Sequence, residues 1–139
     1  MALTISVLAE RPDLVDALWG MENTWPEFMR HDPIGGLFYR NVEERFADYV
    51  LVGQDDAGEV VAAAYSIPFV LDGDDLPDNG WDGVIRSGVL ASISGDQPNA
   101  VSAVEIACSA SSGCPDGNRA RALHASLSAM ESLPSMRSA

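Results

Sequence analysis

The sequence predicts a single α+β domain in which helices flank a sheet. Two observations carry this prediction: strand-like and helix-like segments alternate along the chain, and two strand-like segments are joined by a turn typical of an antiparallel hairpin. The 139 residues, 47% hydrophobic and 21% charged, can bury a core of their own. We expect residues 1–130 to form the domain and 131–139 to be a disordered tail.

The N-terminal segment is predicted to be a strand followed by a helix. Apolar and polar residues alternate over 3–8, and this segment has neither the basic nor the uninterrupted apolar region of a signal peptide. Pro12 suits a first helical turn. The apolar residues that follow at helical spacing are Leu14, Leu18 and Met21.

A second helix is predicted over about 39–49, after two interruptions. The segments 25–28 and 32–36 contain proline and glycine and are expected to break the helical pattern. The residues expected on the buried face of the second helix are Val42, Phe46 and Tyr49.

A hairpin is predicted next. The segments 49–53 and 59–70 are rich in valine, alanine and aromatic residues, and the Gly-containing turn at 54–58 predicts that they pair antiparallel. Pro68 cannot donate to a sheet ladder, so we expect it at an edge or a bulge. A loop over 71–80 follows.

An amphipathic helix over 81–93, ending at Gly95, is predicted before the last strand. The residues expected on its buried face are Val84, Ile85, Val89 and Ile93. The strand at 100–109 is followed by a loop at 110–118 and a helix at 119–130. That helix is expected to bury Leu123, Leu127 and Met130.

Glu105 is the main candidate for catalysis. Strict alternation would direct Ala103, Glu105 and Ala107 to one face of the strand, and the small alanines leave room beside the carboxylate. The other face would carry Val104, Ile106 and Cys108. Two interpretations stay open: a glutamate at a solvent-exposed strand edge, or a general base whose pKa is raised by burial.

The composition excludes several classes of function. Eight basic against 21 acidic residues give a net charge of −13, which disfavours nucleic acids and anionic membranes as partners. All the basic residues are arginines, so lysine Schiff bases and P-loop lysines are excluded. No apolar stretch is long enough to span a membrane. Two cysteines and two histidines give no disulfide framework or zinc site, and we expect a soluble, cytoplasmic protein.

Other candidate sites have ordinary explanations. The acidic loop 72–75 lacks the later positions of an EF-hand loop, so no metal site is expected. Neither Cys108 nor Cys114 has a nearby base apart from His124, and a strand cysteine that faces the core is usually inert. We expect His31 and His124 to be surface or cap residues.

Residues 1–106 resemble the front part of actinobacterial members of the GNAT superfamily of N-acetyltransferases. The segments that carry the resemblance are 8–15 (LAERPDLV), 25–29 (WPEFM), 32–33 (DP), 49–52 (YVLV), 76–82 (LPDNGWD) and 101–106 (VSAVEI). The resemblance implies a mostly antiparallel GNAT-like sheet flanked by helices. It also implies transfer of an acetyl group from acetyl-CoA to a small-molecule or peptide amine, with Glu105 as the general base.

The resemblance also implies where acetyl-CoA would bind. The residues concerned are Ile106, Ala107, Gly117, Asn118, Arg119, Ala120 and Arg121. The phosphate loop of such enzymes has glycines where this chain has Arg119 and Arg121, and an Arg or Gln where it has Asp116. The arginines could bind phosphate through their side chains, or their bulk could block the backbone contacts that phosphate needs.

The resemblance further implies that the C-terminal half of the fold is absent and that the serine-rich segment from about Ala107 arises from a frameshift or an early stop. A second hypothesis is therefore a non-catalytic GNAT-like domain whose strand edge pairs with another chain, as in a homodimer. For an acceptor, the residues expected to line the pocket are Trp25, Phe28 and Tyr65, which could equally be core residues.

Overall fold

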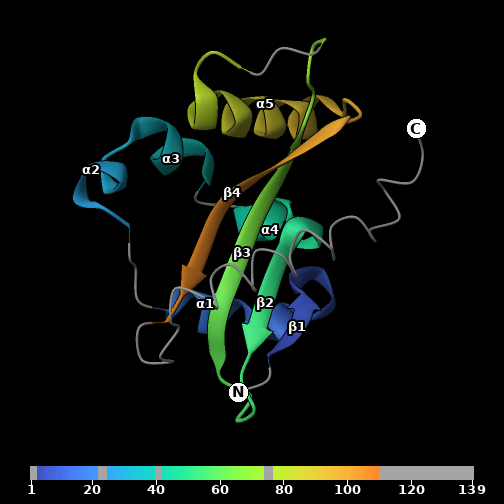
Figure 1. The fold of residues 1–139 in the computed structure, drawn as a ribbon. Helices are drawn as coiled ribbons and strands as arrows, with labels where there is room; N and C mark the ends of the chain where they lie inside the picture. Colours follow the sequence, from blue (N-terminus) through green and yellow to red (C-terminus); the bar gives the residue numbers. More distant parts are fainter. Residues whose placement is uncertain (1–2, 22–24, 40–41, 74–76, 110–139) are drawn as a thin grey trace.

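The described chain forms a four-stranded antiparallel sheet in the order β1-β2-β3-β4 (Figure 1). A computed structural model describes residues 3–21, 25–39, 42–73 and 77–109. The strands are β1 (Thr4–Val7), β2 (Val50–Gln54), β3 (Val60–Phe69) and β4 (Ala100–Cys108). The predicted α+β class, the strands and the β2–β3 hairpin are confirmed.

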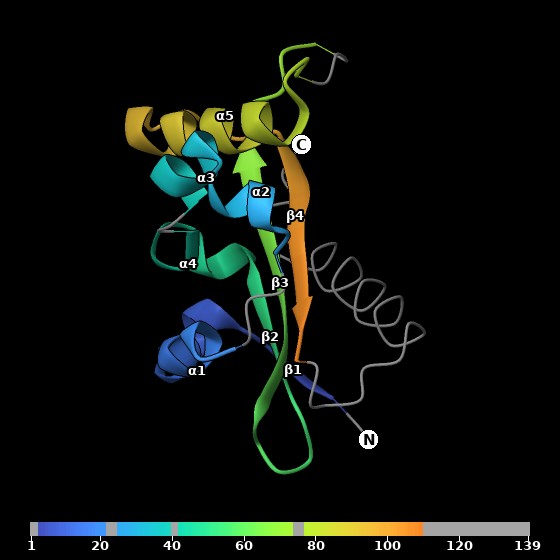
Figure 2. The same ribbon diagram turned by 90° about the vertical axis from the view of Figure 1, so that its left-hand side faces the viewer.

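Helices cover one face of the sheet (Figure 2). They are α1 (Val15–Trp19), α2 (Glu27–Arg30), α3 (Pro33–Phe38), α4 (Val42–Arg45) and α5 (Gly80–Ser94). Short 3₁₀ turns at Leu8–Glu10, Pro12–Leu14 and Ala47–Tyr49 connect them to the strands. Within the described ranges, none of these helices has the length and apolar character needed to cross a membrane.

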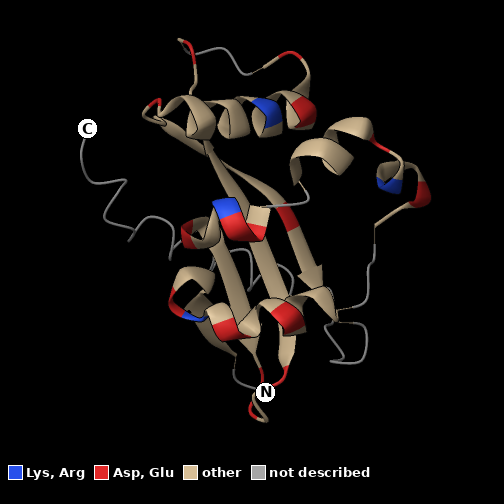
Figure 3. Ribbon diagram, turned by 180° about the vertical axis from the view of Figure 1, so that it is seen from behind, with Lys and Arg blue, Asp and Glu red and all other residues tan. Residues whose placement is uncertain are grey.

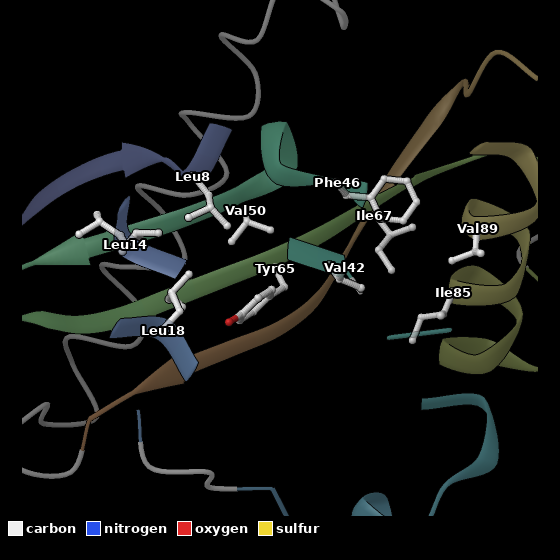
Figure 4. Packing of buried hydrophobic residues seen from close by; sticks show 12 residues of the cluster. Leu8, Leu14, Leu18, Val42, Phe46, Val50, Tyr65, Ile67, Ile85 and Val89 are labelled. Atoms are coloured by element: carbon white, nitrogen blue, oxygen red, sulfur yellow. The ribbon is translucent and has the colours of Figure 1, made fainter. Parts of the chain in front are cut away.

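The hydrophobic core lies between that helical layer and the sheet (Figure 4). Its buried members are Leu8, Leu14, Leu18, Val42, Phe46, Val50, Val52, Ala63, Tyr65, Ile67, Ile85 and Val89. Most of the predicted buried positions are confirmed. Ile93 is an exception with 64% exposure, because each helical residue advances by about 100° and Ile93 lies about 40° beyond Val89, past the buried arc of α5.

Gly88 is where α5 packs most closely against β3. A Cβ atom at this position would lie 2.2 Å from Cγ2 of Ile67 and 2.7 Å from the carbonyl oxygen of Pro68. Only a residue without a side chain allows this approach. The helix ends as predicted, with Gly95 in the left-handed conformation at φ 77°.

The region between α1 and β2 differs from the prediction. The segment expected to break at 32–36 instead starts α3, because the Asp32 side chain accepts a hydrogen bond from the Gly35 amide and Pro33 occupies the first helical turn. Likewise Glu27–Arg30 forms the short helix α2. The helix expected over 39–49 is interrupted, since α4 ends at Arg45 and a 3₁₀ turn follows.

A bulge in β4 overturns the strict alternation predicted for that strand. Tyr65 pairs with Glu105 and Ser66 with Ala103, so Val104 is an extra residue without a register partner. Adjacent residues of β3 point to opposite faces, and Ala103 and Glu105 therefore do so too. Ala107, opposite Ala63, remains on the face of Glu105.

Pro68 lies where only one neighbouring strand pairs with β3. The β2 partners of β3 end at Tyr65, whereas β4 continues to pair as far as Phe69. The expected edge position of this proline is confirmed. The predictions for 110–139, including the helix at 119–130, the tail, Cys114 and His124, lie outside the described residues.

Candidate functional site

A cleft of about 490 Å³ opens between the helices, the middle of β3 and the C-terminal part of β4. Three of its sides come from elements far apart in the sequence: α1 and α2, the α3–α4 region, and the two strands. Its lining residues are Leu18, Trp19, Met21, Trp25, Met29, Arg30, Gly35, Gly36, Tyr39, Glu43, Tyr65, Glu105 and Ala107.

Glu105 points into this cleft and is held by two donors. The Trp25 indole N–H donates to Oε1, and the Tyr39 hydroxyl donates to Oε2 at 2.6 Å. Because the bulge at Val104 shifts the register, Glu105 lies opposite Tyr65 on the helix-covered face. The carboxylate is therefore partly buried and oriented, and it does not lie at a solvent-exposed edge.

An aromatic cluster holds the donors in place. The Trp25 ring lies 5.3 Å from the Tyr39 ring and 5.6 Å from the Trp81 ring, centroid to centroid. Tyr39 also packs against Tyr65 at 5.9 Å and against Trp81 at 5.6 Å. The Trp81 indole donates to the carbonyl of Val104 at 3.1 Å. The bulge and the donors of Glu105 are thus parts of one packed unit.

A second carboxylate, Glu43 of α4, faces the same cleft. It accepts a hydrogen bond from the Tyr65 hydroxyl. Burial raises the pKa of Glu43, the charge of Glu105 adds to this effect, and the Tyr65 hydrogen bond opposes it. Burial, followed by the neighbouring carboxylates, also raises the pKa values of Tyr39 and Tyr65, so both phenols remain protonated donors at neutral pH.

Two carboxylates and one arginine line the cleft, and Figure 3 shows more acidic than basic positions along the described ribbon. Arg30 is the one basic residue among the lining residues, and its side chain is 47% exposed and lies 3.7 Å from Glu27. A site with two carboxylates among aromatic rings can bind a cation and can accept a proton from it.

The outer edge of β4 runs beside Glu105. The Ser109 amide donates to the Val61 carbonyl of β3 at 2.9 Å, and because amides alternate in direction along a strand, the Ile106 amide faces away from β3. No strand in the described ranges pairs with this edge. An unpaired strand edge of this kind can form hydrogen bonds with an extended chain that carries amide groups.

The structure brings together most of the predicted site residues that it describes. Trp25, Tyr65, Glu105 and Ala107 line the cleft, and Ile106 lies next to it on β4. Phe28 does not line it, because this residue is 76% exposed on α2. The remaining predicted cofactor residues, 117–121, lie outside the described part of the chain.

Sequence reasoning missed Tyr39, Glu43 and Trp81 as site residues. Tyr39 and Glu43 belong to a segment whose pattern predicts only an amphipathic helix, and Trp81 is the first residue of the helix predicted at 81–93. The signal that the sequence offers for Tyr39 and Trp81 is their aromatic character, since only 7% of the chain is aromatic. The contacts of Tyr39 and Trp81 with β4, and of Glu43 with Tyr65 of β3, depend on the tertiary structure.

The other sequence candidates lie apart from this chemistry. His31 is exposed at the end of α2, with Nε2 3.2 Å from Glu27, which confirms it as a surface residue. Cys108 is buried. The described residues contain no group of three or more His, Cys, Asp or Glu side chains that could hold a metal ion.

Comparison with known proteins gives one distant relative. No family model matches the chain. The chain is 27% identical over 116 residues to a protein of Aspergillus versicolor named arginine N-acetyltransferase avaD. The match includes 74% of this chain but only 40% of that protein, so the chain spans well under half the length of this relative.

Proposed function

We propose that this chain is an N-acetyltransferase domain of GNAT type that transfers the acetyl group of acetyl-CoA to the amine of a cationic small molecule. The observation that carries the proposal is the position of Glu105: a carboxylate held by Trp25 and Tyr39 in an aromatic cleft, directly beside the outer edge of β4. The antiparallel sheet with helices on one face is compatible with such a fold. The name of the fungal relative supports the same reaction class.

Glu105 is the general base in this proposal. The amine arrives as an ammonium ion, binds the ionised carboxylate and loses a proton to it, directly or through one water molecule. The neutral nitrogen then has the lone pair that forms the new C–N bond. Acetyl-CoA, when bound, would supply the acetyl thioester. As the C–N bond forms, the C–S bond breaks, and the thiolate that leaves takes up the second proton lost by the nitrogen and becomes the free thiol.

Trp25 and Tyr39 are positioning residues. Their donor groups hold both oxygens of Glu105, which fixes the orientation of the carboxylate toward the cleft. Ala107, two residues further along the same face of β4, leaves room for the acetyl group beside it. On the cofactor side, the Ile106 amide would pair with the pantetheine arm.

The acceptor is small and positively charged. A cleft of about 490 Å³ has the size of a site for a small molecule. Two carboxylates and four aromatic rings favour a cation there over a neutral or acidic compound. The name of the relative makes arginine the first acceptor to test.

The test combines binding with turnover. Acetyl-CoA in large excess over its Kd is expected to raise the melting temperature of the full 139-residue chain, since a ligand that binds only the folded state stabilises it by about 2.7 kcal/mol at a hundredfold excess. With arginine added, thiol release and acetylarginine detected by mass spectrometry should exceed a control mixture without protein. The proposal would be refuted if acetyl-CoA did not change the melting temperature and if neither arginine nor any other amine tested were acetylated.

A further inference from the structure

We propose that Glu43 is a specificity-determining residue, which binds a second positive charge on the acceptor, separate from the amine that is acetylated. The inference rests on the proposed function and assigns a substrate class to the same cleft. That class is a linear molecule with a reactive amine at one end and a guanidinium or ammonium group at the other.

The two carboxylates occupy distinct positions in one cleft. Glu105 belongs to β4 and accepts from Tyr39, whereas Glu43 belongs to α4 and accepts from Tyr65. The two tyrosine rings pack against each other with centroids 5.9 Å apart. Each carboxylate therefore has its own tyrosine donor.

Within the described ranges, no ion pair with a basic side chain balances the charges of the two carboxylates. Among the described residues, neither Glu43 nor Glu105 forms an ion pair, and the basic residue at the cleft, Arg30, interacts with Glu27. Two negative charges that share a partly buried cleft repel each other. A ligand with two positive groups would relieve this repulsion, whereas a ligand with one would leave a carboxylate uncompensated.

The chemistry of the transfer separates the roles of the two charges. The amine that attacks the thioester must give up its proton to Glu105 and become neutral. It cannot at the same time be the lasting counter-ion of Glu43. A second cation that keeps its charge throughout the reaction can do so, and a guanidinium is the best candidate, because it stacks on aromatic faces and binds carboxylates with two parallel hydrogen bonds.

Arginine and citrulline form a matched pair of probes for this site. They have the same chain length and the same α-amine, but citrulline has a neutral urea in place of the guanidinium. Equilibrium binding of each to the full chain without acetyl-CoA is measured by calorimetry, and the transfer rate is then measured with acetyl-CoA. Three variants are compared with the wild type: Glu43→Gln, the charge-retaining Glu43→Asp, and Glu44→Gln, which removes the same charge from the exposed neighbouring residue.

We expect the wild type to bind arginine about 10 to 100 times more tightly than citrulline, the range expected for a hydrogen-bonded charge pair. Glu43→Gln should abolish this preference and leave citrulline binding nearly unchanged. Glu44→Gln should keep it, and Glu43→Asp, which also serves if the glutamine variant does not fold, should retain part of it.

Three results would overturn the inference: equal binding of the two probes to the wild type, a preference that survives in Glu43→Gln, or loss of citrulline binding along with that of arginine. Failure of the proposed function is a different result. Selective arginine binding without acetyl transfer would refute the transferase alone. Transfer to both probes at equal rates would refute the role of Glu43 alone.

Discussion

The hydrogen bond between Tyr39 and Glu105 can be measured by a double-mutant cycle. Tyr39→Phe removes one hydroxyl and keeps the ring that packs against Trp25, Tyr65 and Trp81. Glu105→Leu removes the acceptor at similar volume. The double variant completes the cycle, and the non-additivity of the three changes in unfolding free energy reports the interaction between the two side chains.

The expected coupling is about 1.5–2 kcal/mol. A hydrogen bond to a charged group contributes about 1.5–3 kcal/mol, and the 2.6 Å distance is that of a strong O–H···O⁻ bond. The lower part of this range applies because Glu105 lines the cleft, where water can replace the lost hydroxyl in Tyr39→Phe. The Trp25 bond to the other oxygen is lost in both proteins that carry Glu105→Leu, so its loss cancels from the coupling energy.

Urea denaturation followed by tryptophan fluorescence gives the unfolding free energies of the four proteins. A control cycle pairs Tyr39→Phe with Glu59→Gln in the exposed β2–β3 turn and should show coupling near zero. A Tyr39–Glu105 coupling as small as that of the control would show that the hydroxyl does not bind the carboxylate, and the geometry assigned to the site would be wrong.

Two further predictions concern packing and titration. Gly88→Ala should destabilise the fold by about 1–2 kcal/mol, because the clash with Ile67 outweighs the better helix propensity of alanine. Gly36→Ala in α3 is the control, since a Cβ there meets no atom within 4 Å, and it should be neutral or stabilising. Thermal melts of both variants test this prediction. Burial raises the pKa of Glu43 above its ordinary value of 4.5, so the folded state binds this proton more tightly than the unfolded chain does. The free energy of unfolding therefore decreases as the pH rises from 4.5 through the pKa of the folded state. Relative to wild type, Glu43→Gln should therefore gain stability across this pH window, and a constant difference would contradict the burial of Glu43. The titratable or charged groups that share its cleft are Arg30, Tyr39, Tyr65 and Glu105.

The strands and the longest helix were predictable because their patterns are local. Residues 59–70 alternate little but are rich in valine, alanine and aromatic residues, and the glycine-containing turn before them fixes their partner. Val84, Ile85 and Val89 mark the buried face of α5, and Gly95 marks its end. Ile93 lies four residues after Val89, a spacing that predicts burial, but the further advance of about 40° takes it past the buried arc.

The bulge and the short helices were not predictable in this way. Val104 is apolar and continues a regular alternation, so nothing in the sequence indicates that it is an extra residue. Asp32 and Pro33 gave a correct signal for a helix start, but the two glycines that follow favoured a loop. Helices of four to six residues are stabilised by tertiary packing more than by their own propensity.

The candidate site was predictable only in part. Glu105 was identifiable because it is the one charged residue in an otherwise uncharged strand. Its donor Tyr39 is 66 residues away in the sequence, and only the fold shows that the two side chains meet. Trp25 and Phe28 belong to the same short segment, yet one enters the cleft and the other is exposed, a difference that three residues of sequence do not reveal.

The most direct measurement is the rate of acetyl transfer to arginine by the full chain and by Glu105→Gln, which keeps the size of the side chain and removes its basicity. If Glu105 is the general base, the rate should fall by about 10² to 10⁴ while arginine still binds, and Glu59→Gln should match the wild type. A Glu105→Gln variant that is folded and keeps the wild-type rate would show that this carboxylate does not accept the proton of the amine.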